Sequence, residues 1–159
     1  MKALTLALLL ALGSLWGCDR ALSGELTSMD KTTGCRFQPP GTWKFAVIRW
    51  AGPCENNVAE GSGVLRAYEG AKVVEAFYGS IEHGQLVVGV IESDGGFLAG
   101  RFENGKHLES QDPQTFIQAF RAASDAATRA SEIFRRSGNN ASATYYAEKA
   151  KVLERQMAD

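Results

Sequence analysis

The chain has 159 residues, of which 45% are hydrophobic and 22% charged, and its formal net charge at pH 7 is −1. This length suffices for one compact domain, or for one domain with an appendage. Neither the overall charge nor any local run of lysine and arginine makes a basic patch, which argues against nucleic acid as a partner.

The first eighteen residues have the parts of an export signal. Lys2 supplies a basic start, residues 3–12 are an unbroken apolar run, and small residues come shortly before Cys18. The run has about ten residues and is too short to span a bilayer, which needs about 20. The sequence therefore predicts a signal peptide over residues 1–17 that is removed on export.

The end of this segment, Leu15-Trp16-Gly17-Cys18, resembles the lipobox of bacterial lipoproteins. Leu15 and Gly17 fit that pattern, whereas Trp16 is bulkier than the small residue usual between them. The resemblance implies that Cys18 carries lipid, palmitate included, and anchors the mature chain on the periplasmic side of the envelope. A plain secretory signal cleaved near Gly17 is the alternative, and inner and outer membrane both stay open.

Two further cysteines follow the signal. With Cys18 assigned to lipid, Cys35 and Cys54 form an even pair in an oxidising compartment, which predicts a disulfide between them. This link would constrain the unfolded chain by roughly 3 kcal/mol in the entropy model. A metal or redox pair is the alternative, but the spacing is not CxxC and no third ligand lies near.

The composition divides the rest of the chain into three parts. Residues 18–33 are polar with little periodicity, which predicts a flexible tether. Residues 34–108 are punctuated by glycine and rich in valine and aromatic residues, which predicts a β domain. Its strand-like runs, which indicate an antiparallel meander, are residues 42–50, 63–68, 73–78, 86–92 and 97–102.

Residues 112–159 predict a helical hairpin, and hence an α+β fold. Asp112 suits the cap of a first helix and Pro113 its first turn, Gly138 suits its end, and Asn140 or Ser142 suits the start of a second helix. The pair is expected either to pack on the sheet or to self-associate. Its expected apolar stripes are Phe116, Phe120, Ala123, Ala127, Ala130 and Phe134, then Tyr146, Ala150, Leu153 and Met157.

Aromatic residues and glycines recur in the β region. The first copy contains Trp50, Gly52, Gly61 and Gly63, the second Phe77, Gly79 and Gly84, and a truncated third Gly100, Phe102 and Gly105. Over residues 43–106 this pattern resembles the MORN repeat. The resemblance implies that each copy is a two-stranded hairpin whose aromatic residue packs on the next copy, and it implies a scaffold or lipid-proximal role. A generic meander whose glycines only serve turns is the alternative.

The chain offers few residues for catalysis. His83 is expected in a turn and His107 in a solvated loop, and neither is next to a plausible nucleophile or in metal-ligand spacing. Residues 94–96, Asp-Gly-Gly, predict a hairpin turn rather than a phosphate loop. The sequence therefore predicts a protein that is not an enzyme and has no metal or cofactor.

The leading hypothesis for function is a non-enzymatic cell-envelope lipoprotein, a scaffold or binding module for another envelope protein or for the membrane surface. The candidate binding residues are aromatic, although residues of this kind more often form the core: Trp50, Tyr68, Phe77, Tyr78 and Phe102. The alternative is a periplasmic inhibitor or immunity protein that neutralises a toxin or lytic enzyme.

Overall fold

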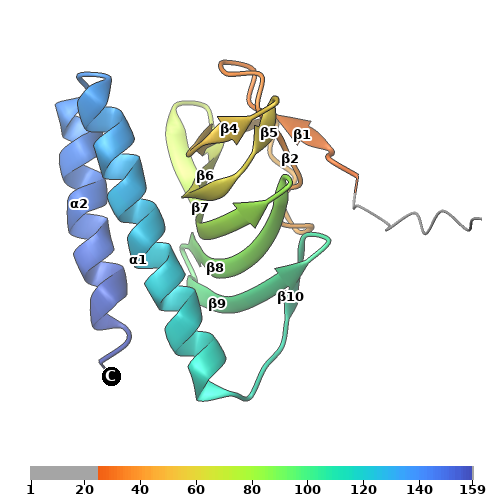
Figure 1. Cartoon of the computed structure of the whole chain (residues 1–159), viewed down its shortest axis with the longest axis vertical. Helices are drawn as coiled ribbons and strands as arrows, with labels where there is room; N and C mark the ends of the chain where they lie inside the picture. The colour runs from red at the N-terminus through yellow and green to blue at the C-terminus, as the bar shows by residue number, and fades with distance from the viewer. Residues whose placement is uncertain (1–24, 159) are drawn as a thin grey trace, which may run out of the picture.

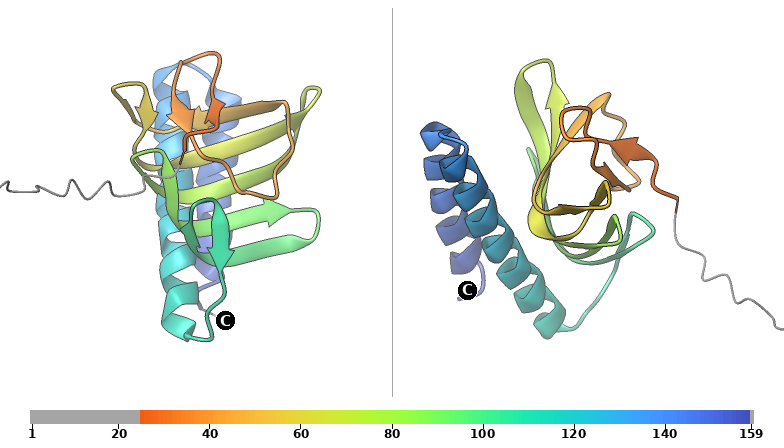
Figure 2. Two further views of the ribbon diagram at one scale, coloured as in Figure 1. Left: turned by 90° about the vertical axis from the view of Figure 1, so that its right-hand side faces the viewer. Right: turned by 45° about the horizontal axis from the view of Figure 1, so that its top comes forward.

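The computed structural model describes residues 25–158. Its centre is a curved antiparallel sheet with a pair of helices on one face and a small second sheet on the other (Figures 1 and 2). In spatial order the strands of the large sheet are β10 (Lys106–Leu108), β9 (Gly96–Glu103), β8 (Gln85–Ser93), β7 (Lys72–Glu82), β6 (Gly61–Glu69) and β3 (Val47–Ala51).

Consecutive strands from β6 to β10 are neighbours, so this part of the sheet is a meander. Short hairpin turns join these strands. Two of the turns, His83-Gly84 and Asn104-Gly105, have positive φ at both residues. This conformation matches the right-handed twist of the flanking strands and explains the glycines there.

The small sheet contains β1 (Ser28–Met29), β2 (Arg36–Phe37), β5 (Val58–Ala59) and β4 (Cys54–Glu55) in that spatial order. Its strands have two residues each, and only the β2–β5 pair is parallel. It lies against the face of the large sheet that is opposite the helices (Figure 2). Runs this short have no readable alternation, so the sequence analysis did not find them.

The helices are α1 (Pro113–Arg136) and α2 (Asn140–Arg155). Hairpin strands followed by a two-helix hairpin confirm the predicted α+β class. Asp112 accepts a hydrogen bond from the Gln114 backbone N–H at 3.0 Å, as a cap requires. The second helix begins at Asn140, one of the two predicted starts, and Asn139 caps it by accepting a hydrogen bond from the Ser142 N–H at 3.0 Å.

α1 lies across β6 to β9, and α2 packs mainly on α1. Two serine hydroxyls of α1 join the pair: Ser131 donates to the Ala143 carbonyl at 2.7 Å and Ser124 to the Ala150 carbonyl at 3.1 Å. The predicted alanine stripe is buried here within one chain, so self-association through it would require the pair to leave the sheet. Phe116 is 48% exposed, contrary to the predicted stripe, because the first turns of α1 extend past the edge of the sheet (Figure 1).

Two strand predictions need correction. The run over residues 42–50 is strand only from Val47, because a turn in which the Trp43 N–H donates to the Pro40 carbonyl at 2.9 Å comes before it. β10 was missed, since its three residues are too few for a pattern.

Candidate functional site

The disulfide between Cys35 and Cys54 is present, with the two Cα atoms 5.9 Å apart. Cys35 is fully buried just before β2, and Cys54 begins β4. The link therefore joins two strands of the small sheet that are not neighbours. A disulfide of this kind is typical of exported proteins.

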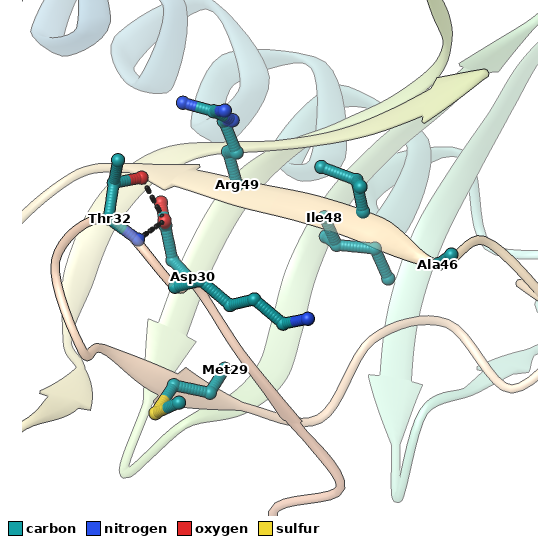
Figure 3. Close-up of a pocket in the computed structure, with 8 residues that line it drawn as sticks. Met29, Asp30, Thr32, Ala46, Ile48 and Arg49 are labelled. Atoms are coloured by element: carbon teal, nitrogen blue, oxygen red, sulfur yellow. Dashed lines mark hydrogen bonds between the residues drawn. The ribbon is translucent and has the colours of Figure 1, made fainter. Parts of the chain in front are cut away.

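A second link holds the amino-terminal segment on the large sheet through Asp30, which is 2% exposed. Its carboxylate accepts hydrogen bonds from the backbone N–H of Thr32 at 2.8 Å and from the Thr32 hydroxyl (Figure 3). It also accepts a hydrogen bond from the Trp50 N–H at 3.0 Å. The last bond satisfies an outward-facing donor on the edge strand β3. Burial raises the pKa of Asp30, but these hydrogen bonds and the charge of Arg49 outweigh it and lower the pKa below its ordinary value.

The predicted tether over residues 18–33 is therefore too long. β1 starts at Ser28, the Asp30 N–H donates to the Cys35 carbonyl at 2.8 Å, and the side chain of Leu26 packs over Gly84. The polar composition of this segment concealed a turn stabilised by side-chain hydrogen bonds. Cys18 and the predicted signal peptide lie outside the described residues.

The glycines of the predicted repeats form a row across the large sheet. Gly63 pairs with Gly79, Gly79 with Gly89 and Gly89 with Gly100. Aromatic rings cover this row: a Cβ on Gly63 would lie 2.5 Å from the Trp50 ring, and one on Gly79 would lie 2.6 Å from the Phe77 ring. Because glycine has no side chain, these positions leave room for the rings.

The other repeat glycines lie either under an aromatic ring or at positions with positive φ. Gly52 also lies under the Trp50 ring, whereas Gly61, Gly84 and Gly105 adopt positive φ. The motif residues therefore shape the sheet, its turns and its core.

Four of the five aromatic residues considered for a binding face are buried, which confirms the core interpretation for them: Trp50, Phe77, Tyr78 and Phe102. Phe77 meets Phe102 edge to face with ring centroids 5.4 Å apart, and the Trp50 indole N–H donates to the Pro53 carbonyl at 2.7 Å. Only Tyr68 remains partly accessible.

The two histidines are far from a common site. The His83 side chain is 94% exposed in the β7–β8 turn, as predicted. His107 is not a loop residue: it lies in β10, with Nε2 3.1 Å from the Ala99 carbonyl and its ring against Phe102. Within residues 25–158 no three side chains of metal-ligand type are grouped as a metal site would need.

A cavity lies between α2 and the helix-facing side of β6 and β7. It has a volume of about 480 Å³. The strands contribute Arg66, Tyr68 and Tyr78, and α2 contributes Ser142, Tyr145 and Tyr146. Tyr145 is 52% exposed. We call this cavity the tyrosine cleft.

Burial keeps two phenols of the tyrosine cleft, those of Tyr78 and Tyr146, in their neutral form. Desolvation raises the pKa of Tyr78 far above its usual value. Desolvation also raises the pKa of Tyr146 to about 12, against the opposing influence of the Arg66 guanidinium. Both hydroxyls are therefore neutral donors at neutral pH, and Arg66 is the charged group of the cleft.

An ion pair joins α2 directly to the sheet. Lys149 Nζ lies 2.6 Å from a carboxylate oxygen of Glu92 on β8, and both side chains are largely shielded from water.

Sequence reasoning missed Arg66 and Tyr145. The available signal was a charged residue alternating with Val64 and Tyr68 on the inward side of a strand.

Comparison of the chain with protein-family models, curated proteins and solved structures found no match. The MORN-repeat resemblance therefore stays a prediction. None of the helices within residues 25–158 has the length and apolar character needed to cross a membrane.

Proposed function

We propose that the protein is a non-enzymatic lipoprotein of the bacterial cell envelope. In this proposal lipid on Cys18 anchors it on the periplasmic side, and a MORN-like sheet serves as the scaffold for a binding surface on the helix layer. The partner is another envelope macromolecule.

The small number of residues between Cys18 and the first strand carries this proposal. Nine residues, 19–27, separate Cys18 from β1. At most they span about 30 Å, since a fully extended chain covers about 3.3–3.6 Å per residue. The described chain begins on the side of the sheet away from the helices (Figure 1). An anchor at Cys18 would therefore keep the domain close to the membrane and attach it through the side of the sheet opposite the helix layer.

The placement of the potential catalytic groups favours binding over catalysis. The His83 side chain is almost fully exposed in a turn, and His107 contacts a backbone carbonyl. Neither lines the tyrosine cleft, whose walls are phenols, a hydroxyl and a guanidinium. Such walls suit recognition of a ligand.

The anchor is tested by replacing its cysteine. Cys18→Ser should move the protein from the membrane fraction to the soluble envelope fraction and abolish incorporation of labelled palmitate. Cys54→Ser is the matched control, because it removes a cysteine without removing the lipid site, and it should stay with the membrane. Unchanged fractionation of Cys18→Ser would refute the anchor.

The partner is tested by photo-crosslinking in intact cells. A benzophenone amino acid at Thr144, exposed on α2, should give a specific adduct. The same probe at Glu55, exposed on the small sheet, is the control and should not. An adduct with a toxin or a lytic enzyme would favour the inhibitor alternative, and adducts at neither position would contradict both binding hypotheses.

A further inference from the structure

Two arginines of the large sheet lie directly opposite each other. Arg49 on β3 pairs with Arg66 on β6, so both side chains are on the helix-facing side. Like charges directly opposite in a sheet are destabilising. Within the part of the chain that the structure describes, neither guanidinium has a carboxylate within salt-bridge distance. Asp30, the acid that Arg49 helps to ionise, is already bonded to Thr32 and Trp50.

Aromatic rings stabilise this arrangement in part. The Tyr68 ring centroid lies 5.8 Å from the guanidinium carbon of Arg49 and 5.7 Å from that of Arg66. Arg66 also lies 5.0 Å from the ring centroid of Phe134 on α1. Cation–π contacts leave the N–H groups of a guanidinium available, and Arg66 Nε is buried without a hydrogen-bond partner. The Arg66 guanidinium also interacts with the Tyr146 hydroxyl, but its buried Nε–H remains a donor without an acceptor.

Arg66 lines the tyrosine cleft, and Arg49, which is not part of the lining, contacts the ring of the lining residue Tyr68. Its aromatic walls come from both layers of the fold: Tyr68 and Tyr78 from the sheet, Tyr145 and Tyr146 from α2. Tyr146 is stacked on Phe134 with an interplanar angle of 9°. A volume of about 480 Å³ can hold a ring or a branched aliphatic group beside the guanidiniums.

We propose that the tyrosine cleft binds an organic carboxylate that carries an aromatic or aliphatic group, with the carboxylate on Arg49 and Arg66 and the apolar group between the tyrosines. The planar fork of a guanidinium matches a carboxylate in two parallel hydrogen bonds. A single negative charge fits better than a phosphate dianion, because transfer into a half-buried aromatic site costs more free energy for the higher charge.

The orientation of the cleft distinguishes this ligand from anionic lipid headgroups. The cleft belongs to the helix layer, and the described chain begins on the opposite side of the sheet (Figure 1). This step rests on the proposed anchor at Cys18, which would attach the domain through the side opposite the helix layer. The affinity for a carboxylate does not depend on the anchor, so the two proposals can fail separately.

The test is saturation-transfer difference NMR on the purified mature protein with a matched pair of probes. N-acetyl-phenylalanine carries the carboxylate, and N-acetyl-phenylalaninamide has the same ring without the charge. We expect saturable binding of the acid at least about tenfold tighter than that of the amide, as expected for charge-assisted hydrogen bonds. Equal affinities, or no saturable binding of the acid, would overturn the proposal.

Variants separate the charge from the ring. Arg49→Gln, at an exposed position, should remove most of the preference for the acid without affecting folding. Arg66→Gln, at a half-buried position, should also remove most of the preference in protein that keeps its native circular dichroism. Arg101→Gln, an exposed arginine on β9, is the control and should leave the preference unchanged. Tyr145→Ala should weaken both probes by a similar factor. Retention of the preference in Arg49→Gln and Arg66→Gln, in protein with native circular dichroism, would count against the site.

Competition identifies the source of the anion. Inorganic phosphate and phosphatidylglycerol vesicles should each displace the acid only at concentrations well above its own Kd. If phosphate alone binds as tightly as the acid, the proposal that the ligand carries an aromatic or aliphatic group is wrong. If the vesicles bind more tightly through the same two arginines, the carboxylate is wrong and the cleft is a lipid site.

Discussion

The two faces of the large sheet are covered in different ways. On one face, α1 presents small side chains, with Ala119, Ala123, Ala126, Ala127 and Ala130 all fully buried. On the other, large rings lie over the glycine row: Trp50, Phe77 and Phe102 from the sheet itself, with Phe37 and Trp43 from the amino-terminal segment.

The difference shows which interactions each layer needs in order to remain packed on the large sheet. A regular helix satisfies its own backbone, so alanine is enough to bring it close to the sheet. Strands of two residues are too short to be stable alone. The small sheet therefore depends on a disulfide, on Asp30 and on large aromatic contacts to remain packed on the large sheet. Perturbing each face should therefore produce different losses of stability.

The largest loss is expected for Trp50→Ala on the aromatic face. It removes a buried ring that fills the space over Gly52 and Gly63, together with the hydrogen bond to Pro53. We expect a loss of about 3–5 kcal/mol in the free energy of unfolding, measured by urea denaturation. Phe116→Ala, at an exposed aromatic residue of α1, should cost at most about 1 kcal/mol. Comparable losses would contradict the distinction between the two positions.

Reduction of the Cys35–Cys54 disulfide should have the next largest effect, about 2–4 kcal/mol. Hydrogen exchange of the reduced protein should show lost protection at the amides of the small sheet, while α1 and α2 keep theirs. Thiol labelling of the exported protein gives the control, since neither cysteine should react before reduction. Equal loss of protection in the helices would show that the two covers are not independent.

Overpacking the alanine face should cost less. Ala127→Leu adds three carbons in the core between α1, α2 and the sheet, which we expect to lower stability by about 1–3 kcal/mol in urea denaturation. Thr128→Leu adds a similar side chain at the neighbouring exposed position and should change little. A stable Ala127→Leu protein would indicate that α1 is less closely packed than its burial suggests.

The helix face could be predicted almost to the residue, since its signals are local. Asp112, Pro113 and Gly138 act within one turn of their own positions, and the alanine spacing is visible in the sequence alone. The cover of the other face could not be predicted, because the short strands depend on contacts distant in sequence, such as the 20-residue separation between Asp30 and Trp50.

The tyrosine cleft was missed for the same reason. Alternation along β6 puts Arg66 and Tyr68 on one face, which is readable from the sequence. That Arg49 lies opposite Arg66 depends on the register of β3 against β6, and that Tyr145 reaches the cleft depends on how α2 packs. The disulfide was predictable because elimination left one pair of cysteines.

The smallest of these effects is expected for Asp30→Asn, and it depends on pH. The folded pKa of Asp30 lies below its ordinary value of 3.8, so the unfolded state binds more protons between the two values and stability falls as the pH falls through that window. At pH 7 we expect wild type to be more stable than Asp30→Asn by about 1–2 kcal/mol in urea denaturation, because the ionised carboxylate accepts three hydrogen bonds.

This advantage should shrink as the pH falls below 3.8, because wild type then becomes protonated at Asp30 and resembles the variant. Asp94→Asn, in the exposed β8–β9 turn, is the control and should follow wild type throughout. An advantage that grows in acid, or that Asp94→Asn also loses, would mean that Asp30 does not attach the amino-terminal segment to β3. The aromatic face would then depend on the disulfide and ring packing alone.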